Sequence, residues 1–167
     1  MERKVLIAYY SHSGNTKIVA ESIKKGTSGT LFEIQPDPAY PADYNATIRQ
    51  ARNEKQRGYT PALKYSVGDI KVYDIIFVGS PNWFGAPASP VVTFLSETDL
   101  SGKTAVPFCT HGGGGEAHVL SGIAEKCPHP EVLKGLAVHS NDCGNAEAMV
   151  SKWLRDIKMG TSYHAEE

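Results

Sequence analysis

Six consecutive residues near the start of the chain combine hydroxyl, amide and imidazole groups with one glycine: Ser11, His12, Ser13, Gly14, Asn15 and Thr16. They lie between an apolar run and a helical pattern. The first turn of a helix has backbone N–H groups without partners and a positive dipole end, which together attract an anion. Because no Lys or Arg lies in the segment, dipoles and hydroxyls would hold that anion. We predict a phosphate site here, with an ordinary Ser/Asn helix cap as the alternative.

A second segment, residues 80–87, places two large aromatic residues side by side among prolines and a glycine: Pro81, Asn82, Trp83, Phe84 and Gly85 are at its centre. Large aromatic rings are costly to leave exposed to water. A flat ring stacked on such a side chain gains about 0.5–1.5 kcal/mol beyond the area that it buries. We predict that Trp83 borders a flat ligand. The alternative is that both rings cover the core below them.

A third segment contains a run of four glycines: Thr110, His111, Gly112, Gly113, Gly114 and Gly115. Glycines allow the backbone to approach a ligand closely and leave its N–H groups unobstructed by side chains. We predict that this segment contacts the same ligand. The alternative is a merely flexible loop.

Each of the three segments follows a short apolar run of the kind found in buried parallel strands. The expected strands are residues 5–10, 31–34, 75–79, 104–108 and, more weakly, 136–138. The expected helices are 15–25 with Gly26 at its end, 89–95 with Ser89 as cap, 116–127 halted by Pro128, and 146–157. In the last helix an apolar stripe, including Met149 and Trp153, is predicted to be buried.

This alternation predicts an α/β fold with a doubly wound, five-stranded parallel sheet and helices on both faces. The carboxyl ends of parallel strands meet at one edge, where ligands bind. We expect one domain over residues 1–160 and a polar, frayed tail over 161–167. Residues 36–72 form an insertion over the sheet edge, with a helix at 42–55. We hypothesise that Tyr40, Tyr44 or Tyr59 in this insertion caps the ligand's edge.

Composition narrows the function classes. The chain has 167 residues, with 17 Lys and Arg against 18 Asp and Glu, so its charge gives no case for nucleic acid or an acidic membrane as partner. No apolar run is long enough to span a bilayer. Three scattered cysteines favour a reducing cytoplasm over a disulfide framework. Cys109, His111 and His118 offer too few ligands in the wrong spacing for a metal site, so we expect none.

Other activities that use a sheet of this kind lack their required residues. A phosphoacceptor domain needs carboxylates where Tyr10 and Gly79 stand, and a small tyrosine phosphatase needs Arg where Gly115 follows Cys109. The P-loop pattern Gly-x4-Gly-Lys-Ser/Thr is absent. Residues 112–117 spell the dinucleotide pattern Gly-x-Gly-x-x-Ala, but after the fourth strand instead of the first.

The three segments resemble the ligand loops of the flavodoxin-like family, most closely its small bacterial FMN-binding members. Residues 11–16 match the family's Ser/Thr-x-Ser/Thr-Gly-x-Thr phosphate loop. Residues 80–85 match the loop that packs an aromatic ring against the flavin, and 110–115 the loop on its other side. The resemblance covers nearly the whole chain, and Gly102-Lys103 before the fourth strand is also typical.

The resemblance implies a three-layer α/β/α sandwich with strand order 2-1-3-4-5, non-covalent FMN and electron transfer, with no catalytic side chain. Ser11, Ser13, Asn15 and Thr16 would hold the phosphate, and Trp83 would stack on or edge the ring. Backbone groups of Asn82, Gly85, His111, Gly112 and Gly113 would address its polar edge. The other members of the three loops complete the implied site: His12, Gly14, Pro81, Phe84, Thr110 and Gly114.

Two departures bear on the function. The chain is nearly neutral, whereas electron-carrier flavodoxins are usually acidic, and His111 and glycines stand where many of them have a Tyr over the flavin. The main expectation is an electron carrier that works with a redox partner protein, as a monomer or weak dimer. An FMN-dependent NAD(P)H:quinone oxidoreductase is the alternative. A flavin-free interaction domain is the second.

Overall fold

The computed structural model describes residues 3–127 and 131–158. Its strands are β1 (Val5–Tyr9), β2 (Thr30–Glu33), β3 (Ile75–Trp83), β4 (Ala86–Pro87), β5 (Thr104–His111), β6 (Glu131–Val132) and β7 (Leu136–His139). Its α-helices are α1 (Asn15–Thr27), α2 (Tyr44–Arg57), α3 (Ser89–Glu97), α4 (Val119–Glu125) and α5 (Glu147–Asp156). Two short 3-10 helices are η1 (Ile70–Val72) and η2 (Ser140–Asn145). The tail 161–167 and Pro128 lie outside the described residues.

The strands form one sheet in the order β2-β1-β3-β5, with β6 and β7 both beside β5. Among the pairings of the named strands, only that of β3 with β4 is antiparallel; an isolated antiparallel bridge also joins Pro36 and Leu63. β6 pairs with the beginning of β5 and β7 with its end, so the predicted fifth strand is present in two pieces. The predicted α/β class and strand order are confirmed. The count of seven strands differs from five because β4 is additional and the fifth strand is split.

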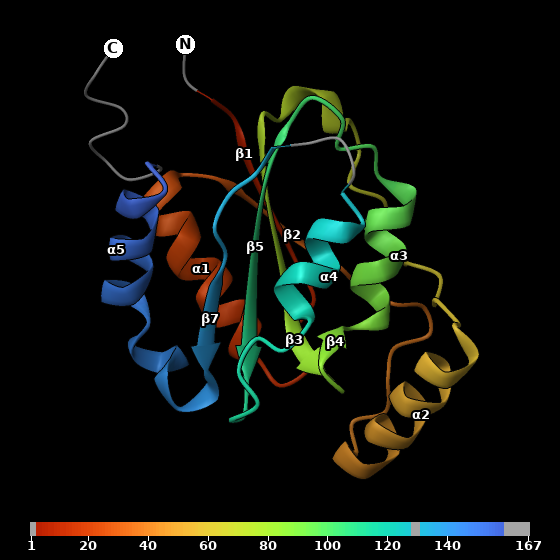
Figure 1. Ribbon diagram of the computed structural model, residues 1–167. Coiled ribbons are helices and arrows are strands. Elements are labelled where there is room, and N and C mark those ends of the chain that lie inside the picture. The colour runs from red at the N-terminus through yellow and green to blue at the C-terminus, as the bar shows by residue number, and fades with distance from the viewer. Residues whose placement is uncertain (1–2, 128–130, 159–167) are drawn as a thin grey trace.

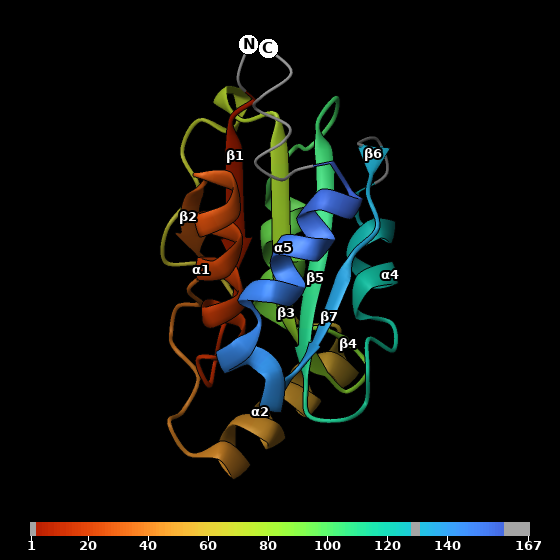
Figure 2. The same cartoon turned by 90° about the vertical axis from the view of Figure 1, so that its left-hand side faces the viewer.

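Helices cover both faces of the sheet (Figure 1). α1 and α5 pack on one face, where Val19, Ile23 and Val150 are fully buried, and Figure 2 shows these two helices in front of the strands. α3 and α4 cover the other face through a second cluster that includes Phe94 and Ile123. Burial of both faces explains why the central strands are continuously apolar instead of alternating.

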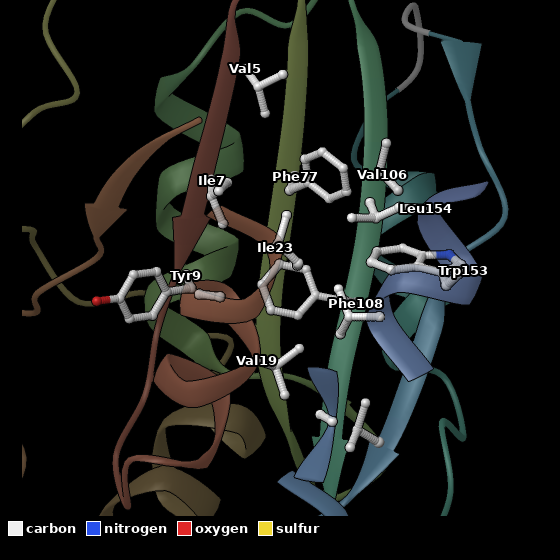
Figure 3. Close-up of a cluster of buried hydrophobic side chains, with 14 of the residues drawn as sticks. Val5, Ile7, Tyr9, Val19, Ile23, Phe77, Val106, Phe108, Trp153 and Leu154 are labelled. Carbon is white, nitrogen blue, oxygen red and sulfur yellow. The ribbon is translucent and has the colours of Figure 1, made fainter. Parts of the chain in front are cut away.

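The cluster beneath α1 and α5 is built around aromatic rings of the central strands (Figure 3). Phe77 of β3 meets Trp153 of α5 edge to face, with ring centroids 5.6 Å apart. The Trp153 indole N–H also donates to the carbonyl of Lys134 at 2.9 Å. Trp153 and its neighbour Leu154 are therefore core residues, as predicted. Met149 was predicted wrongly: its side chain is 40% exposed because it lies at the edge of the stripe that faces the sheet.

Several boundaries differ from the predictions for local reasons. α1 continues through Gly26 to Thr27. The C-cap residue after it, Ser28, takes the left-handed conformation common at helix ends (φ 57°), and its N–H donates to the carbonyl of Lys24. Ser89 is the first residue of α3 instead of its cap, which is Ala88. α4 starts at Val119, three residues later than expected, because residues 116–118 form turns that join it to the glycine run.

The segment between β2 and β3 contains the expected helix, α2, over Tyr44–Arg57. Its first turn is capped by Asp43, whose carboxylate accepts from the N–H of Ala46 at 2.8 Å. In Figure 1, α2 lies beyond the ends to which the arrows of β3, β5 and β7 point. Within this segment, α2 therefore lies at the edge of the sheet to which the three candidate segments belong. No helix among residues 3–127 and 131–158 is long and apolar enough to cross a membrane.

Gly79, in the middle of β3, gives a test of how tightly the sheet is packed below the site. A Cβ atom at this position would lie 2.1–2.7 Å from three ring atoms of Phe108, which is fully buried. We expect Gly79→Ala to lower the free energy of unfolding by about 2 kcal/mol, because an overpacked core must shift side chains or backbone. Chemical denaturation measures this. Gly144→Ala, whose added Cβ meets nothing within 4 Å, is the control and should have little effect; equal stability of the two variants would contradict the packing argument.

Candidate functional site

The three segments singled out in the sequence meet at one pocket of about 340 Å³ at the carboxyl edge of the sheet. Ten of the predicted residues line it: His12, Ser13, Asn15, Pro81, Asn82, Trp83, Phe84, Thr110, His111 and Gly112. Helix α2 forms a further wall. The pocket therefore combines the ends of β1, β3 and β5 with an inserted helix.

The first wall is the loop that leads from β1 into α1. Gly14 occupies the N-cap position in the left-handed region (φ 100°), which only glycine adopts without strain, and it provides no side-chain cap. The Ser11 hydroxyl accepts from the N–H of Gly14 at 3.1 Å and so closes the loop. Ser13 and Asn15 line the pocket, and the first turn of α1 has no acidic residue. An uncapped helix start with small polar side chains is suited to an anion.

Thr16 has a different position from its loop neighbours. Its side chain is 1% exposed and its hydroxyl lies 2.8 Å from the hydroxyl of Thr110, at the end of β5. This bond ties the first segment to the third across the sheet edge. The structure thus gives Thr16 a positioning contact, and direct contact with a phosphate remains a prediction for it.

The second wall is a β-hairpin, where the sequence indicated an irregular loop. β3 continues to Trp83, turns through Phe84 and Gly85, and pairs with β4. Both turn residues have positive φ, 56° and 81°, as a tight two-residue hairpin turn requires. For Phe84 this conformation is unusual, and the residue is 41% exposed. Phe84 therefore does not cover the core.

Contacts from α2 hold the tip of this hairpin. The ammonium of Lys55 donates to the carbonyl of Phe84 at 2.6 Å, and the guanidinium of Arg52 lies 5.3 Å from the centre of the Phe84 ring. On the other side, the N–H of His118 donates to the carbonyl of Gly85 at 2.8 Å. Three contacts thus hold the strained turn in place. Two come from α2 and the third from His118, the residue before α4.

Asn82 joins the second segment to the third. Its amide nitrogen donates to the carbonyl of Gly115 at 3.0 Å, while its amide oxygen accepts from the N–H of Gly85 at 2.8 Å. A Cβ at Gly114 would lie 3.5 Å from that amide nitrogen. Asn82 therefore fixes the hairpin turn and the glycine run relative to each other, using both ends of its side chain.

The third wall is organised by His111. Its Nδ1 accepts from the N–H groups of Gly113 at 3.1 Å and Gly115 at 3.2 Å, so the glycine run folds back on its own first residue. The ring packs edge to face on that of His139, with centroids 5.3 Å apart. Burial, with a smaller contribution from His139, lowers the pKa of His111. Its neutral form is also the one that can accept at Nδ1.

The His111 contacts predict how stability depends on pH. Because the folded state lowers the pKa of His111, the unfolded chain binds more protons as the pH falls below about 6.5, so the stability from this group is complete above that pH and is lost below it. We expect His111→Asn to reduce the difference in unfolding free energy between pH 7.5 and 5.5. Urea titrations at the two pH values measure it. His139→Gln should act in the same direction but less, and an unchanged pH dependence in His111→Asn would contradict the assignment.

Helix α2 is attached to the pocket by polar contacts. The Thr47 hydroxyl donates to the carbonyl of Pro41 at 2.6 Å and lies 3.2 Å from Nε2 of His12, which is itself 3.2 Å from that carbonyl. His12 thus links the loop between β1 and α1 to helix α2. This accounts for a histidine in a loop whose other members are small.

Behind the hairpin, three aromatic rings pack edge to face. Trp83 meets Tyr10 and Tyr40 at centroid distances of 5.3 Å and 5.1 Å. The Tyr40 hydroxyl donates to the carboxylate of Glu54, which is only 2% exposed, at 2.5 Å. Burial and this bond raise the pKa of Tyr40, so the phenol keeps its proton. The indole of Trp83 is therefore supported by two tyrosine rings and also lines the pocket.

The other six predicted residues belong to the same loops but do not line the pocket: Ser11, Gly14, Thr16, Gly85, Gly113 and Gly114. Among the three tyrosines of the hypothesis, Tyr44 lines the pocket, Tyr40 supports Trp83, and Tyr59 lies elsewhere. Four lining residues were missed: Thr47, Ile48, Ala51 and Ser140. The only signal for the first three was the expected helix at 42–55, and nothing in the sequence indicated Ser140.

Comparison of the sequence and the structure with known proteins identifies relatives of this chain. A family model described as Flavodoxin matches residues 4–157. A protein of Gluconacetobacter diazotrophicus named NAD(P)H dehydrogenase (quinone) is 31% identical over 146 residues, which are 80% of this chain and 70% of the relative. A flavoprotein from Bacteroides eggerthii is 28% identical with a TM-score of 0.82, over 93% of this chain and 98% of the other. A flavoprotein from Lactobacillus acidophilus, solved in complex with FMN, is 29% identical with a TM-score of 0.72, over 86% and 97%.

Proposed function

Because the chain belongs to the flavodoxin family, we propose that its pocket binds FMN non-covalently and that the protein transfers electrons through this flavin. The proposal is supported by the L. acidophilus relative that was solved with FMN. Within this chain, one observation carries it. The uncapped start of α1 and the supported indole of Trp83 line the same pocket, so an anion site and a flat apolar surface are adjacent.

The residues of the pocket fit the two halves of FMN. The hydroxyl of Ser13, the amide of Asn15 and the first N–H groups of α1 provide donors for a phosphate, with no carboxylate in the lining to repel it. Trp83 and Phe84 provide apolar surface for a flat ring system. Gly112 and its neighbours provide backbone groups without side chains that could address polar ring atoms.

When bound, FMN would supply a ring that takes up two electrons from a donor and releases them singly or as a pair. The chain's residues would bind and orient it. Asn82 and His111 hold the hairpin turn and the glycine run by hydrogen bonds within the protein, which keeps the pocket walls fixed. No general acid or base is required of the side chains in this role.

A second candidate function is more specific: oxidation of NAD(P)H with a quinone as acceptor. It is favoured by the names of several relatives and by the third wall, which contributes Thr110, His111 and Gly112 but no large aromatic ring. An uncovered flavin face would admit a nicotinamide or a quinone in turn. In the overall reaction NAD(P)H gives up a hydride, and the quinone takes up two electrons and two protons, one of them from solvent. A redox partner protein remains the alternative source or acceptor of electrons.

Two measurements on the purified protein test these proposals. A yellow protein that releases FMN on denaturation supports the flavin site, whereas a colourless protein that takes up no added FMN would favour a flavin-free interaction domain. Oxidation of NADPH or NADH by the FMN-loaded protein with a quinone, and without added partner, supports the oxidoreductase. If a reductase partner is needed before the flavin is reduced, the carrier is supported instead.

The unpaired, buried cysteines favour the cytoplasm as the site of action.

A further inference from the structure

A second pocket of about 280 Å³ adjoins the first on the other side of the hairpin tip. Ala51, Trp83 and Phe84 line both pockets, so the two share this part of their walls. The second pocket extends along the carboxyl-terminal half of α2 toward α4, where Lys126 lines its far side. The proposed flavin site does not account for this pocket.

Positive charge surrounds the second pocket. Lys55 and Lys126 line it, and Arg52 and Arg57 lie over two of its aromatic side chains. The single carboxylate in the lining, Glu54, is buried and accepts a hydrogen bond from Tyr40. Glu54 is also the only acidic residue of α2, whose exposed side carries Arg49 as well. Although the chain is nearly neutral overall, several positively charged side chains thus lie together beside the candidate site.

The same pocket exposes aromatic surface. Phe84 is 41% exposed and Tyr59 is 47% exposed. The guanidinium of Arg52 lies 5.3 Å from the centre of the Phe84 ring, and that of Arg57 lies 5.2 Å from the centre of the Tyr59 ring. Rings with adjacent guanidinium groups provide stacking surface and charge together. A ligand with a flat base and phosphate groups satisfies both features.

We propose that the second pocket binds the adenosine end of NADPH, with its 2′-phosphate near Lys55 and Lys126, while the nicotinamide reaches the first pocket. The inference rests on the proposed function, because it names the nucleotide that would serve the flavin site. The shared lining of the two pockets allows one dinucleotide to extend across Phe84. The extra phosphate is the difference between NADPH and NADH, so the cations predict a preference for NADPH.

The binding test uses 2′,5′-ADP, which contains the adenosine end and the 2′-phosphate but no nicotinamide. Calorimetric titration of the FMN-loaded protein should give saturable binding of 2′,5′-ADP, at least about tenfold tighter than that of 5′-AMP, since one phosphate contact with a cation is worth about that factor. The same 2′,5′-ADP should inhibit NADPH oxidation competitively. Equal affinities for the two nucleotides, or no binding of either, would overturn the proposal.

The charge test uses the double variant Lys55→Gln/Lys126→Gln, neither residue of which lines the first pocket. We expect its KM for NADPH to rise about tenfold. Lys152→Gln, a surface change on α5, is the matched control. Lys126→Gln alone should raise the KM by part of that factor, while its kcat and its affinity for FMN change less than twofold, because it leaves intact the bond between Lys55 and the Phe84 carbonyl that positions the hairpin tip.

The outcomes separate this inference from the function beneath it. If NADPH and NADH are oxidised equally and the double variant behaves as wild type, the second pocket is not a nucleotide site, but the oxidoreductase remains. If neither nucleotide reduces the bound flavin and 2′,5′-ADP still binds, the oxidoreductase is wrong and the nucleotide pocket remains. If an acidic redox protein, but no nucleotide, loses affinity in the double variant, the cations serve a protein partner and the proposal is wrong.

Discussion

Replacing Ser13 with Asp should weaken the binding of FMN by at least about 100-fold, which corresponds to about 2.7 kcal/mol. Ser13 lines the pocket beside the uncapped start of α1, where the dipole and the first N–H groups would hold a phosphate dianion. An Asp carboxylate would repel that phosphate and would itself be attracted to the positive end of the helix where the phosphate would lie. Quenching of flavin fluorescence on titration of apoprotein measures the affinity.

Riboflavin, which lacks the phosphate, is the control ligand for this variant. We expect Ser13→Asp to change the affinity for riboflavin by less than a factor of about three, because the carboxylate then has no anion to repel. Ser28→Asp, the same change at the other end of α1, should leave FMN binding unchanged. Equal losses for FMN and riboflavin in Ser13→Asp would mean that the substitution deforms the pocket and that the phosphate lies elsewhere.

Removing the indole of Trp83 should reduce the affinity for FMN and riboflavin alike, by about 100-fold, since stacking, buried area and the position of the hairpin are lost together. Trp83 lines the pocket and packs against Tyr10 and Tyr40, so Trp83→Ala removes both the proposed ring contact and the support of the wall. Titration with each flavin gives the two affinities.

Two further variants separate ring contact from wall support. Trp83→Phe retains an aromatic face and should recover most of the affinity. Tyr40→Phe keeps the ring behind Trp83 and removes the bond to Glu54, so it should lower the free energy of unfolding more than it lowers flavin affinity. If Trp83→Ala bound both flavins as tightly as wild type, the indole would not border the ring and the site would need a different flat surface.

The parts of the site that the sequence predicted are those fixed by strand order. The central parallel strands are β1 (Val5–Tyr9), β3 (Ile75–Trp83) and β5 (Thr104–His111). Continuous apolar runs of this kind are typical of a sheet that is buried on both faces. Once the strands are parallel, their carboxyl ends must meet at one edge. The meeting of three distant loops therefore followed from pattern alone.

The parts that the sequence did not predict depend on contacts between side chains that are distant in sequence. α2 was expected as a helix, but its place at the pocket is set by the bonds among His12, Pro41 and Thr47 and by the Tyr40–Glu54 pair. A periodic pattern reports that a helix has a buried face and does not report what covers it. The hairpin turn was likewise read as a loop, because Phe84 at positive φ departs from the usual residue preference.

The central claim is that this pocket holds FMN by its phosphate, and a titration of the wild-type apoprotein with FMN and with riboflavin tests it most directly. We expect one FMN per chain, with an affinity at least about 100-fold above that for riboflavin, because donors at the start of α1 would contact only the phosphate. Equal affinities for the two flavins would contradict a phosphate site at α1, and no uptake of either would contradict the flavin site itself.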